Sequence, residues 1–360
     1  MKLWYRNMNM LEDSGDAGDH YNFSYPLTNG VFTNYGEKAA ISLVENGPAK
    51  IMYKIEWDLK LPKCLKDTTA RSDEFINNKV ICYIILRSNA KTIEFKMVID
   101  NCSYDHRLRV VFPTGLNCEK SSSGSQFYVI DRSTTKPKVE SYAEEPMGNY
   151  PHRLFVDISD TAKGITFMDR GLPEYEATPK GNLYITLLRS TGKLSKDSVQ
   201  ERLYCNAGPM YNTPLAQEIG SHTYEYALYF HKGDWKDAQS YRHCDEFYAK
   251  PKSMQGDAHE GELNNYRSFL KLSGDGVVLS AFKKGTGENE WIVRVYNVLN
   301  KEVECNIQLL KPIKEAFHTD LNENPLNDIP IDYDKIYFTI SAHEIFTILV
   351  KLYNIDNKNI

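Results

Sequence analysis

Two neighbouring stretches, KVICYIILRS (79–88) and KTIEFKMVID (91–100), decide the fold class of this chain. Both are rich in β-branched and aromatic residues, which favour strands, and apolar side chains alternate with polar ones in the second. Similar stretches recur along the chain: RLRVVFP (107–113), QFYVIDRS (126–133), NLYITLLRS (182–190), HTYEYALYFH (222–231), GVVLSAFKK (276–284), EWIVRVYNV (290–298) and YFTISAHEIFTILVKLY (337–353). Turn-forming clusters such as SSSGS (121–125) and GTGEN (285–289) separate them. We therefore expect an all-β protein of packed antiparallel sheets.

The sequence also predicts where this β-rich chain divides. Only the segment 234–248 has the pattern of a short helix. The run from Ala249 to Asn264 is polar and has no apolar periodicity, which is typical of a linker. We expect a large β domain over residues 1–250, a linker over 251–264 and a small β-sandwich over 265–360.

The composition of the chain argues against several classes of binding partner. The formal net charge of −5 gives no basic footprint for nucleic acid or for an anionic membrane. No apolar run is long enough to span a bilayer, and the first residues lack the apolar core of a signal peptide, so we expect a cytoplasmic protein. The seven cysteines are odd in number and form no C-x-x-C pair, which argues against a disulfide framework or a zinc knuckle.

An acidic, glycine-rich segment, EDSGDAGD (12–19), runs directly into His20 and Tyr21. Four carboxylates in eight residues repel one another unless they are solvated, paired or coordinated. An ordinary surface loop, a ligand-lining loop and a calcium site are all compatible with this composition. The spacing does not match a twelve-residue helix-loop-helix calcium loop.

The same segment, as LEDSGDAGDHYNFS (11–24), resembles the start of the C-terminal β region of bacterial glycoside hydrolase family 38 α-mannosidases. Further stretches resemble that family in the same order, and together they cover most of the chain: DHRLRVVFPTGL (105–116), PHRLFVDISD (151–160), GITFMDRGLPEYEA (164–177), ITLLRSTGKLS (185–195), GPMYNTPLAQEIGSHTYEYALYFHKG (208–233) and VVLSAFKK (277–284).

The resemblance implies a galactose-mutarotase-like super-sandwich followed by a small terminal β-sandwich. In the family this region packs against a catalytic domain that holds zinc, an Asp nucleophile and an Asp general acid, and that domain is missing from the matched segments. Retaining hydrolysis needs two carboxyl groups on either side of the scissile bond. We therefore expect no cofactor and no catalytic residue in this chain, and zinc in the catalytic domain, supplied in cis or by a separate chain.

Two segments are candidates for contact with an α-mannoside. By resemblance, Tyr21 matches a family tyrosine whose hydroxyl touches the sugar, with Asp19 in the same loop; a tyrosine in the core is the alternative. Asp169, Arg170 and Gly171 resemble a loop whose backbone carbonyl meets sugar hydroxyls. An Asp-Arg pair beside a glycine turn is also commonly an internal salt bridge that pins a loop.

Several other polar residues have structural interpretations. His318-Thr319-Asp320 is an H-x-D triplet, and its place in a polar turn argues against a metal site. His222 lies on an alternating strand, which favours a half-buried histidine with satisfied hydrogen bonds, and Gln217 is read in the same way. His152 and Arg153 are typical of a strand entry.

The segment 2–7 resembles the end of a family strand, so we expect further strands to precede it in a longer parent. Three functions remain open from the residues. The first is a non-catalytic β portion that supports an α-mannosidase, and the second is a free-standing carbohydrate-binding module. The third is a mutarotase-like epimerase, for which no local motif specifies the acid and base. Assembly into a homo-oligomer is compatible with the family but is not specified by the residues.

Overall fold

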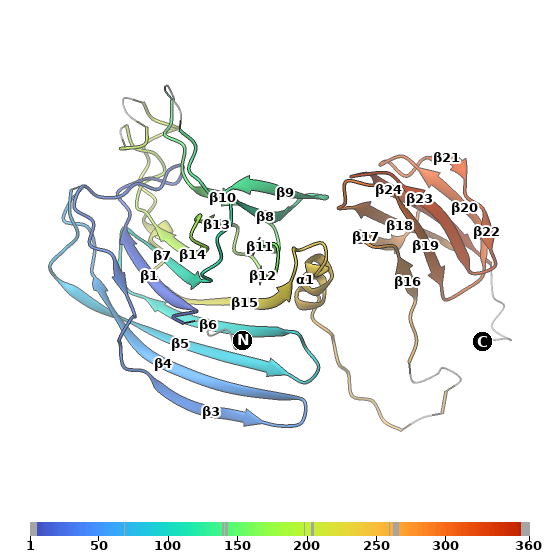
Figure 1. The fold of residues 1–360 in the computed structure, drawn as a ribbon, viewed down its shortest axis with the longest axis horizontal. Coiled ribbons are helices and arrows are strands. Elements are labelled where there is room, and N and C mark those ends of the chain that lie inside the picture. Colours follow the sequence, from blue (N-terminus) through green and yellow to red (C-terminus); the bar gives the residue numbers. More distant parts are fainter. Residues whose placement is uncertain are drawn as a thin grey trace. The chain divides into compact units, whose positions relative to one another are not determined.

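The computed structural model describes residues 6–67, 69–138, 140, 143–197, 199–202, 205–258, 260–261 and 266–353. In these residues strands dominate, and the helical elements are one α-helix, α1 (Ser240–Tyr248), and one short 3-10 helix, η1 (Pro214–Gln217). The prediction of an all-β protein is confirmed (Figure 1). None of the helices in this part of the chain is long and apolar enough to cross a membrane.

The chain forms two compact units. The first contains residues 1–124 and 130–248, and the second contains residues 125–129 and 249–360. Residues 249–258, where the sequence predicts a linker, have no helix or strand. Part of that predicted linker, residues 259 and 262–264, lies outside the described residues. The domain limits at 250 and 265 stay a prediction.

Two antiparallel sheets build the first unit. In sheet order, the six-stranded sheet consists of β10 (Asn149–Pro151), β13 (Glu174–Ala177), β14 (Asn182–Ser190), β7 (His106–Pro113), β1 (Met10–Gly15) and β2 (Phe32–Thr33). The nine-stranded sheet consists of β3 (Ala40–Asn46), β4 (Lys50–Pro62), β5 (Phe75–Arg87), β6 (Thr92–Asn101), β15 (Gly220–Lys232), β12 (Lys163–Asp169), β11 (Phe155–Ser159), β8 (Lys120–Ser125) and β9 (Tyr128–Ser133).

The core of the first unit lies between these two sheets. Phe112 on β7 and Phe167 on β12 are both fully buried, with ring centroids 5.7 Å apart. Tyr226 on β15 meets Phe112 edge-on at 6.1 Å. Alternation along each strand produces this layer, because every second side chain points to the same face of a sheet.

The second unit is a smaller two-sheet structure whose core includes Val293, Ile336 and Ile348, all fully buried. Its four-stranded sheet consists of β16 (Leu270–Ser273), β19 (Val303–Leu309), β23 (Lys335–Ile340) and β22 (Ile331–Asp332). Its five-stranded sheet consists of β17 (Val277–Lys284), β18 (Glu290–Asn297), β24 (Ile345–Leu352), β20 (Ile313–Thr319) and β21 (Pro325–Asp328).

Three details differ from the sequence predictions. The stretch SSSGS is not a turn but lies within β8, because its buried hydroxyls have partners: Ser122 donates to Asp131 at 2.6 Å, and Ser121 and Tyr175 share a hydrogen bond of 3.0 Å. The stretch 337–353 is not one strand, since residues 341–344 turn between β23 and β24. Residues 12–15 of the acidic segment belong to β1, so the loop itself begins at Asp16.

Candidate functional site

The acidic loop (residues 16–24) follows β1 and is held by ion pairs inside the first unit. Three aspartates of the segment are buried, with exposed fractions of 0–1%. Each is paired with a different arginine from a distant part of the chain. The pairs are Asp13 with Arg71, Asp16 with Arg189 and Asp19 with Arg202, at nitrogen–oxygen distances of 2.5, 2.7 and 2.5 Å. The repulsion expected among the carboxylates is therefore relieved by pairing.

Asp19 has the most complete set of partners. Its Oδ1 accepts the backbone N–H groups of Tyr21 and Asn22, both at 2.9 Å, and its Oδ2 accepts the N–H of Lys196 at 2.8 Å. Burial alone would raise the pKa of Asp19. The hydrogen bonds from Arg202 and from these backbone groups outweigh burial, so the pKa lies below its ordinary value. Asp19 is thus ionised, and its two carboxylate oxygens hold the loop in place through their bonds to these buried partners.

Backbone contacts complete the loop. Arg189 donates to the carbonyl oxygens of Asp19 and Asn22 at 2.8 and 3.0 Å, and the Lys196 ammonium donates to the carbonyl of Ala17 at 2.6 Å. Gly18 allows the chain to fold back, because a Cβ there would lie 2.0 Å from the Asn22 carbonyl oxygen. Side chains from β14 and from the connection that follows it therefore hold the backbone of the loop in one conformation.

Arg107 packs against the end of the acidic loop from inside the first unit. It is 1% exposed, and its guanidinium carbon lies 3.4 Å from the centre of the Phe23 ring. Its Nη2 donates to the Tyr25 hydroxyl at 3.2 Å. Burial lowers the pKa of Arg107, and the neighbouring Arg109 lowers it further.

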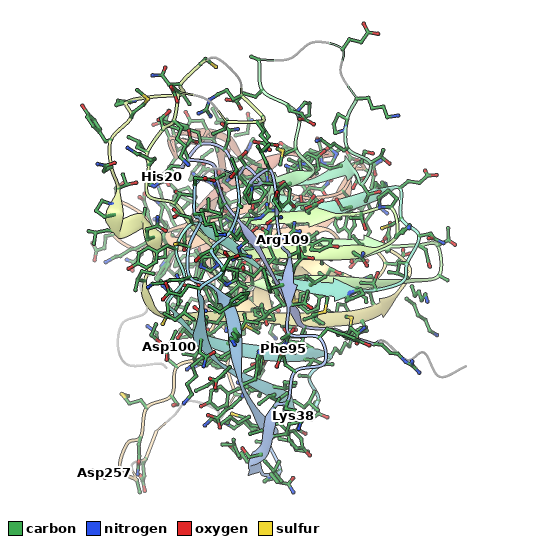
Figure 2. The ribbon with its side chains drawn as sticks, turned by 90° about the vertical axis from the view of Figure 1, so that its left-hand side faces the viewer. His20, Lys38, Phe95, Asp100, Arg109 and Asp257 are labelled. Atoms are coloured by element: carbon green, nitrogen blue, oxygen red, sulfur yellow. The ribbon has the colours of Figure 1, made fainter. Side chains whose placement is uncertain are left out.

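The outer side of the loop presents Tyr21, which is 53% exposed and so is not a core tyrosine. Its hydroxyl lies against Gly208, where an added Cβ would be 2.8 Å from the oxygen. His20, labelled in Figure 2, shares a hydrogen bond of 3.1 Å with Thr213. We use the name Tyr21 rim for the exposed residues His20, Tyr21 and Tyr211 together with the half-buried Gly208. It combines aromatic faces with polar tips, which is a suitable surface for a sugar.

The second predicted segment has different surroundings. Asp169 is 2% exposed; its Oδ2 lies 2.7 Å from Nε2 of His152, and its Oδ1 accepts the N–H groups of Gly171 and Leu172. Arg170 does not pair with Asp169. It donates to Glu225 at 2.9 Å and lies over the ring of Phe247 at 3.9 Å. These contacts pin the loop, and Gly171 has a φ of +104°, a backbone conformation that favours glycine.

The structure does not bring the two predicted segments together. Asp169 is opposite Tyr226 on β15, whereas the acidic loop lies near the other end of that strand, where Gly220 is opposite Asn101. Six residues along a strand correspond to about 20 Å. Any sugar contact by one segment is therefore separate from contact by the other.

The remaining polar candidates have structural contacts. His222 lies 2.7 Å from the carbonyl of Glu218, and Gln217 donates to the Asp105 carboxylate at 2.7 Å. His318 stacks on Phe346 with ring centroids 4.2 Å apart. Among the residues that the structure describes, no three His, Cys, Asp or Glu side chains gather as metal ligands. These residues therefore do not fit the zinc site that the family resemblance implies for a catalytic domain.

Sequence reasoning missed the residues that shape the loop. Arg189 and Lys196 follow the acidic loop by more than 160 residues, and Arg202 and Gly208 lie further along the same connection. The one available signal was the excess of carboxylates in residues 12–19, which requires cations from elsewhere. Which cations these are depends on the fold.

Comparison with known proteins identifies the protein family. Residues 4–195 match the model of the glycosyl hydrolases family 38 C-terminal domain, and residues 276–348 match the model of the family 38 C-terminal beta sandwich domain. Because the first match covers more than half of the chain, the chain belongs to glycoside hydrolase family 38. It corresponds to the C-terminal region of that family, as its sequence predicted.

Individual relatives are longer than this chain. It is 26% identical over 309 residues to a putative mannosylglycerate hydrolase from Halalkalibacterium halodurans, and the match covers 81% of this chain but 33% of that protein. An α-mannosidase structure from Enterococcus faecalis V583 matches 96% of this chain and 39% of its own, with a TM-score of 0.81 and 24% identity. A family 38 protein structure from Enterococcus faecalis gives the same TM-score, and the match covers 96% of this chain and 40% of that protein's chain. The chain thus spans about a third of the length of the curated relative.

Proposed function

We propose that this chain is the C-terminal β portion of a retaining α-mannosidase-like glycoside hydrolase that acts on terminal α-mannosides. In this proposal a catalytic domain, in cis or as a separate chain, supplies the zinc and the reacting carboxyl groups. The chain itself does no chemistry, and it supports the catalytic domain and contributes a sugar contact through the Tyr21 rim. Membership of family 38 and the names of the longer relatives support this proposal.

The buried ion pairs of the acidic loop are the observation on which this proposal rests. A retaining glycosidase needs two carboxyl groups about 5–5.5 Å apart that face the substrate. Asp16 and Asp19 instead face arginines inside the unit. The loop therefore acts as a rigid support, and what it exposes is Tyr21.

The chemistry of this rim supports a sugar as its ligand. A tyrosine offers an apolar ring face and a hydroxyl, which together suit the C–H and O–H groups of a hexose. The name of the curated relative, a putative mannosylglycerate hydrolase, suggests that an α-mannoside bearing a carboxylate belongs among the test ligands.

Calorimetric titration of the whole chain with methyl α-mannoside and with mannosylglycerate tests the sugar contact. We expect binding that is lost in Tyr21→Ala and weakened at least threefold in Tyr21→Phe, which keeps the ring and removes the hydroxyl. Tyr35→Ala is the control, because Tyr35 is 71% exposed and lies outside the rim. Equal affinity of the wild type and Tyr21→Ala, or no heat with the wild type, would refute a sugar contact made by this chain.

A free-standing carbohydrate-binding module is the second candidate, and the exposure of Tyr21 and Tyr211 in this chain favours it. The two candidates differ in their need for a catalytic partner. A binding module would hold α-mannosides with the same affinity whether or not a family 38 catalytic polypeptide is present. A supporting portion would bind them more tightly in the complex.

A further inference from the structure

The second unit contains a hollow of about 780 Å³ at one end of its core. One wall comes from β17, β18 and β24, which are neighbours in the five-stranded sheet (Figure 1), and the other comes from the end of β19 in the four-stranded sheet. Every residue that lines it belongs to this unit. Small-molecule sites typically have volumes of about 300–1,000 Å³. We call this feature the terminal hollow.

The inner part of the terminal hollow continues the apolar core. Trp291 lies two residues before the fully buried Val293 on β18, so both side chains point to the inner face of the sheet. Phe282 on β17 stacks on Trp291, with ring centroids 5.1 Å apart and 26° between the planes. Leu309, which is 4% exposed, lines the wall that belongs to β19. The hollow therefore offers an apolar space next to the core.

Two aromatic side chains line the terminal hollow and remain in contact with water. Phe269 is 69% exposed and Tyr353 is 53% exposed. Their backbones are held in place, because the Phe269 carbonyl accepts the N–H of Leu310 at 3.1 Å and the N–H of Tyr353 donates to the Pro312 carbonyl at 3.4 Å. Large apolar side chains that are exposed together around a hollow are a common mark of a binding site.

The terminal hollow also has an excess of positive charge. Lys284 and Lys311 both line it, and Glu288 is the acidic residue among its described lining residues. Lys284 is directly opposite Trp291 in the ladder between β17 and β18, so its side chain starts from the same inner face. Two ammonium groups and one carboxylate therefore border an apolar space.

The lysines of the terminal hollow differ from neighbouring lysines in having no carboxylate partner. Lys283, the next residue to Lys284, pairs with Glu323 at 2.7 Å, and Lys351 pairs with Glu315 at 3.1 Å. Within the part of the chain that the structure describes, neither lysine of the hollow lies within ion-pair distance of a carboxylate. Their charges are thus available to an anion from solution.

The apolar wall favours one class of ligand over a sugar. Leu309, Leu310 and Leu352 line the hollow, and leucine side chains offer no hydrogen-bond partner. Sugar hydroxyls buried against them would lose their bonds to water without replacement, which is costly. A ligand with an apolar body has no such cost, and an anionic group on it can pair with an ammonium group at the border.

We propose that the terminal hollow binds a small amphipathic anion, a molecule with an apolar ring or chain and one carboxylate or sulfonate group. The apolar body lies beside Trp291 and Leu309, and the anionic group pairs with Lys284 and Lys311. This site needs neither a catalytic domain nor the Tyr21 rim, which belongs to the first unit. It is therefore independent of the proposed function.

Fluorescence titration of the whole chain with 8-anilinonaphthalene-1-sulfonate tests the proposal. N-phenyl-1-naphthylamine is the matched probe, because it has the same rings and no sulfonate. We expect one saturable site for the sulfonate probe. The double variant Lys284→Gln/Lys311→Gln should weaken that probe about tenfold, the loss expected for one hydrogen bond to a charged group, and should leave the affinity of the neutral probe unchanged.

Two further variants show where the probe binds. Tyr353→Ala removes an exposed part of the apolar wall and should weaken both probes. Lys301→Gln is the control for charge and should change neither affinity, because Lys301 lies between β18 and β19, at the opposite end of these strands from the hollow. Lys284 is exposed and Lys311 is half-buried, and neither forms an ion pair, so we expect the double variant to fold; circular dichroism checks this.

Three results would overturn the proposal. The first is the absence of a saturable site for the sulfonate probe. The second is a double lysine variant that binds the sulfonate probe as tightly as the wild type, or that loses both probes equally, since the charge would then not be recognised. The third is displacement of the sulfonate probe by methyl α-mannoside in the wild type but not in Tyr353→Ala, which would make the hollow a sugar site.

Discussion

At the scale of single residues, the acidic loop shows how buried charge can hold a surface side chain in place. Asp19 is fully buried and Arg202 is 2% exposed, so the pair exchanges little with water. Removing one partner of a buried ion pair leaves an uncompensated charge, which typically destabilises a protein by about 3–5 kcal/mol. The orientation of Tyr21 depends on this pair, because Asp19 accepts the N–H of Tyr21.

Asp19→Asn is therefore expected to lower the free energy of unfolding at pH 7 by about 3–5 kcal/mol, measured by urea denaturation. Because the folded pKa of Asp19 lies below its ordinary value, its stabilisation is present above about pH 3.9 and is lost as pH falls through the folded pKa. The difference between the wild type and the variant should shrink in that acid range. Asp73→Asn is the control: its exposed pair with Lys66 should contribute less than about 1 kcal/mol. A variant as stable as the control would contradict this role of Asp19.

At the scale of elements, a polar cluster joins three strands to α1. Nε2 of His231 on β15 lies 2.7 Å from the Asp157 carboxylate on β11, and Thr166 on β12 hydrogen-bonds both Asp157 and Ser240 of α1. Gly164 makes room for the imidazole, since a Cβ there would lie 2.3 Å from its Cε1. The cluster thus fixes the helix on the outer face of the sheet.

This cluster predicts a pH dependence. Burial would lower the pKa of His231, but the hydrogen bond and the charge of Asp157 outweigh burial and raise it. The stabilisation by charged His231 is thus complete below about pH 6.5 and is lost as pH rises through the folded pKa. A hydrogen bond to a charged group typically contributes about 1.5–3 kcal/mol, so the unfolding free energy of the wild type should fall by about this amount as pH rises. We expect this fall to be much smaller in His231→Gln. His222→Gln, at the other end of β15, should keep it. An unchanged pH profile of His231→Gln would refute the assignment.

The elements also show what could be predicted from sequence. Strand β14 has the predicted limits, because its alternating pattern is bounded by Gly181 and Thr191. The strands β3 and β4 were not predicted, although KIMYKIEWDLKLP (50–62) has an apolar side chain at every odd position from Ile51 to Leu61, because the charged residues at its even positions lower the mean hydropathy of the stretch. The Tyr21 rim was predicted only in part. Tyr21 and Asp19 came from a family motif, whereas Arg202 and Gly208 reach the loop through tertiary contacts that no local pattern encodes.

At the scale of the whole molecule, two β units match family 38 models, and no three His, Cys, Asp or Glu side chains of the described residues gather as metal ligands. The central claim is that this chain supports a mannosidase and does no chemistry itself. Hydrolysis of a chromogenic α-mannoside by the purified chain, with zinc added over a range of concentrations, tests that claim most directly. We predict a rate equal to the protein-free blank at every zinc concentration. Turnover that rises with the amount of chain and that Tyr21→Ala reduces would contradict the claim and place the reacting groups in this chain.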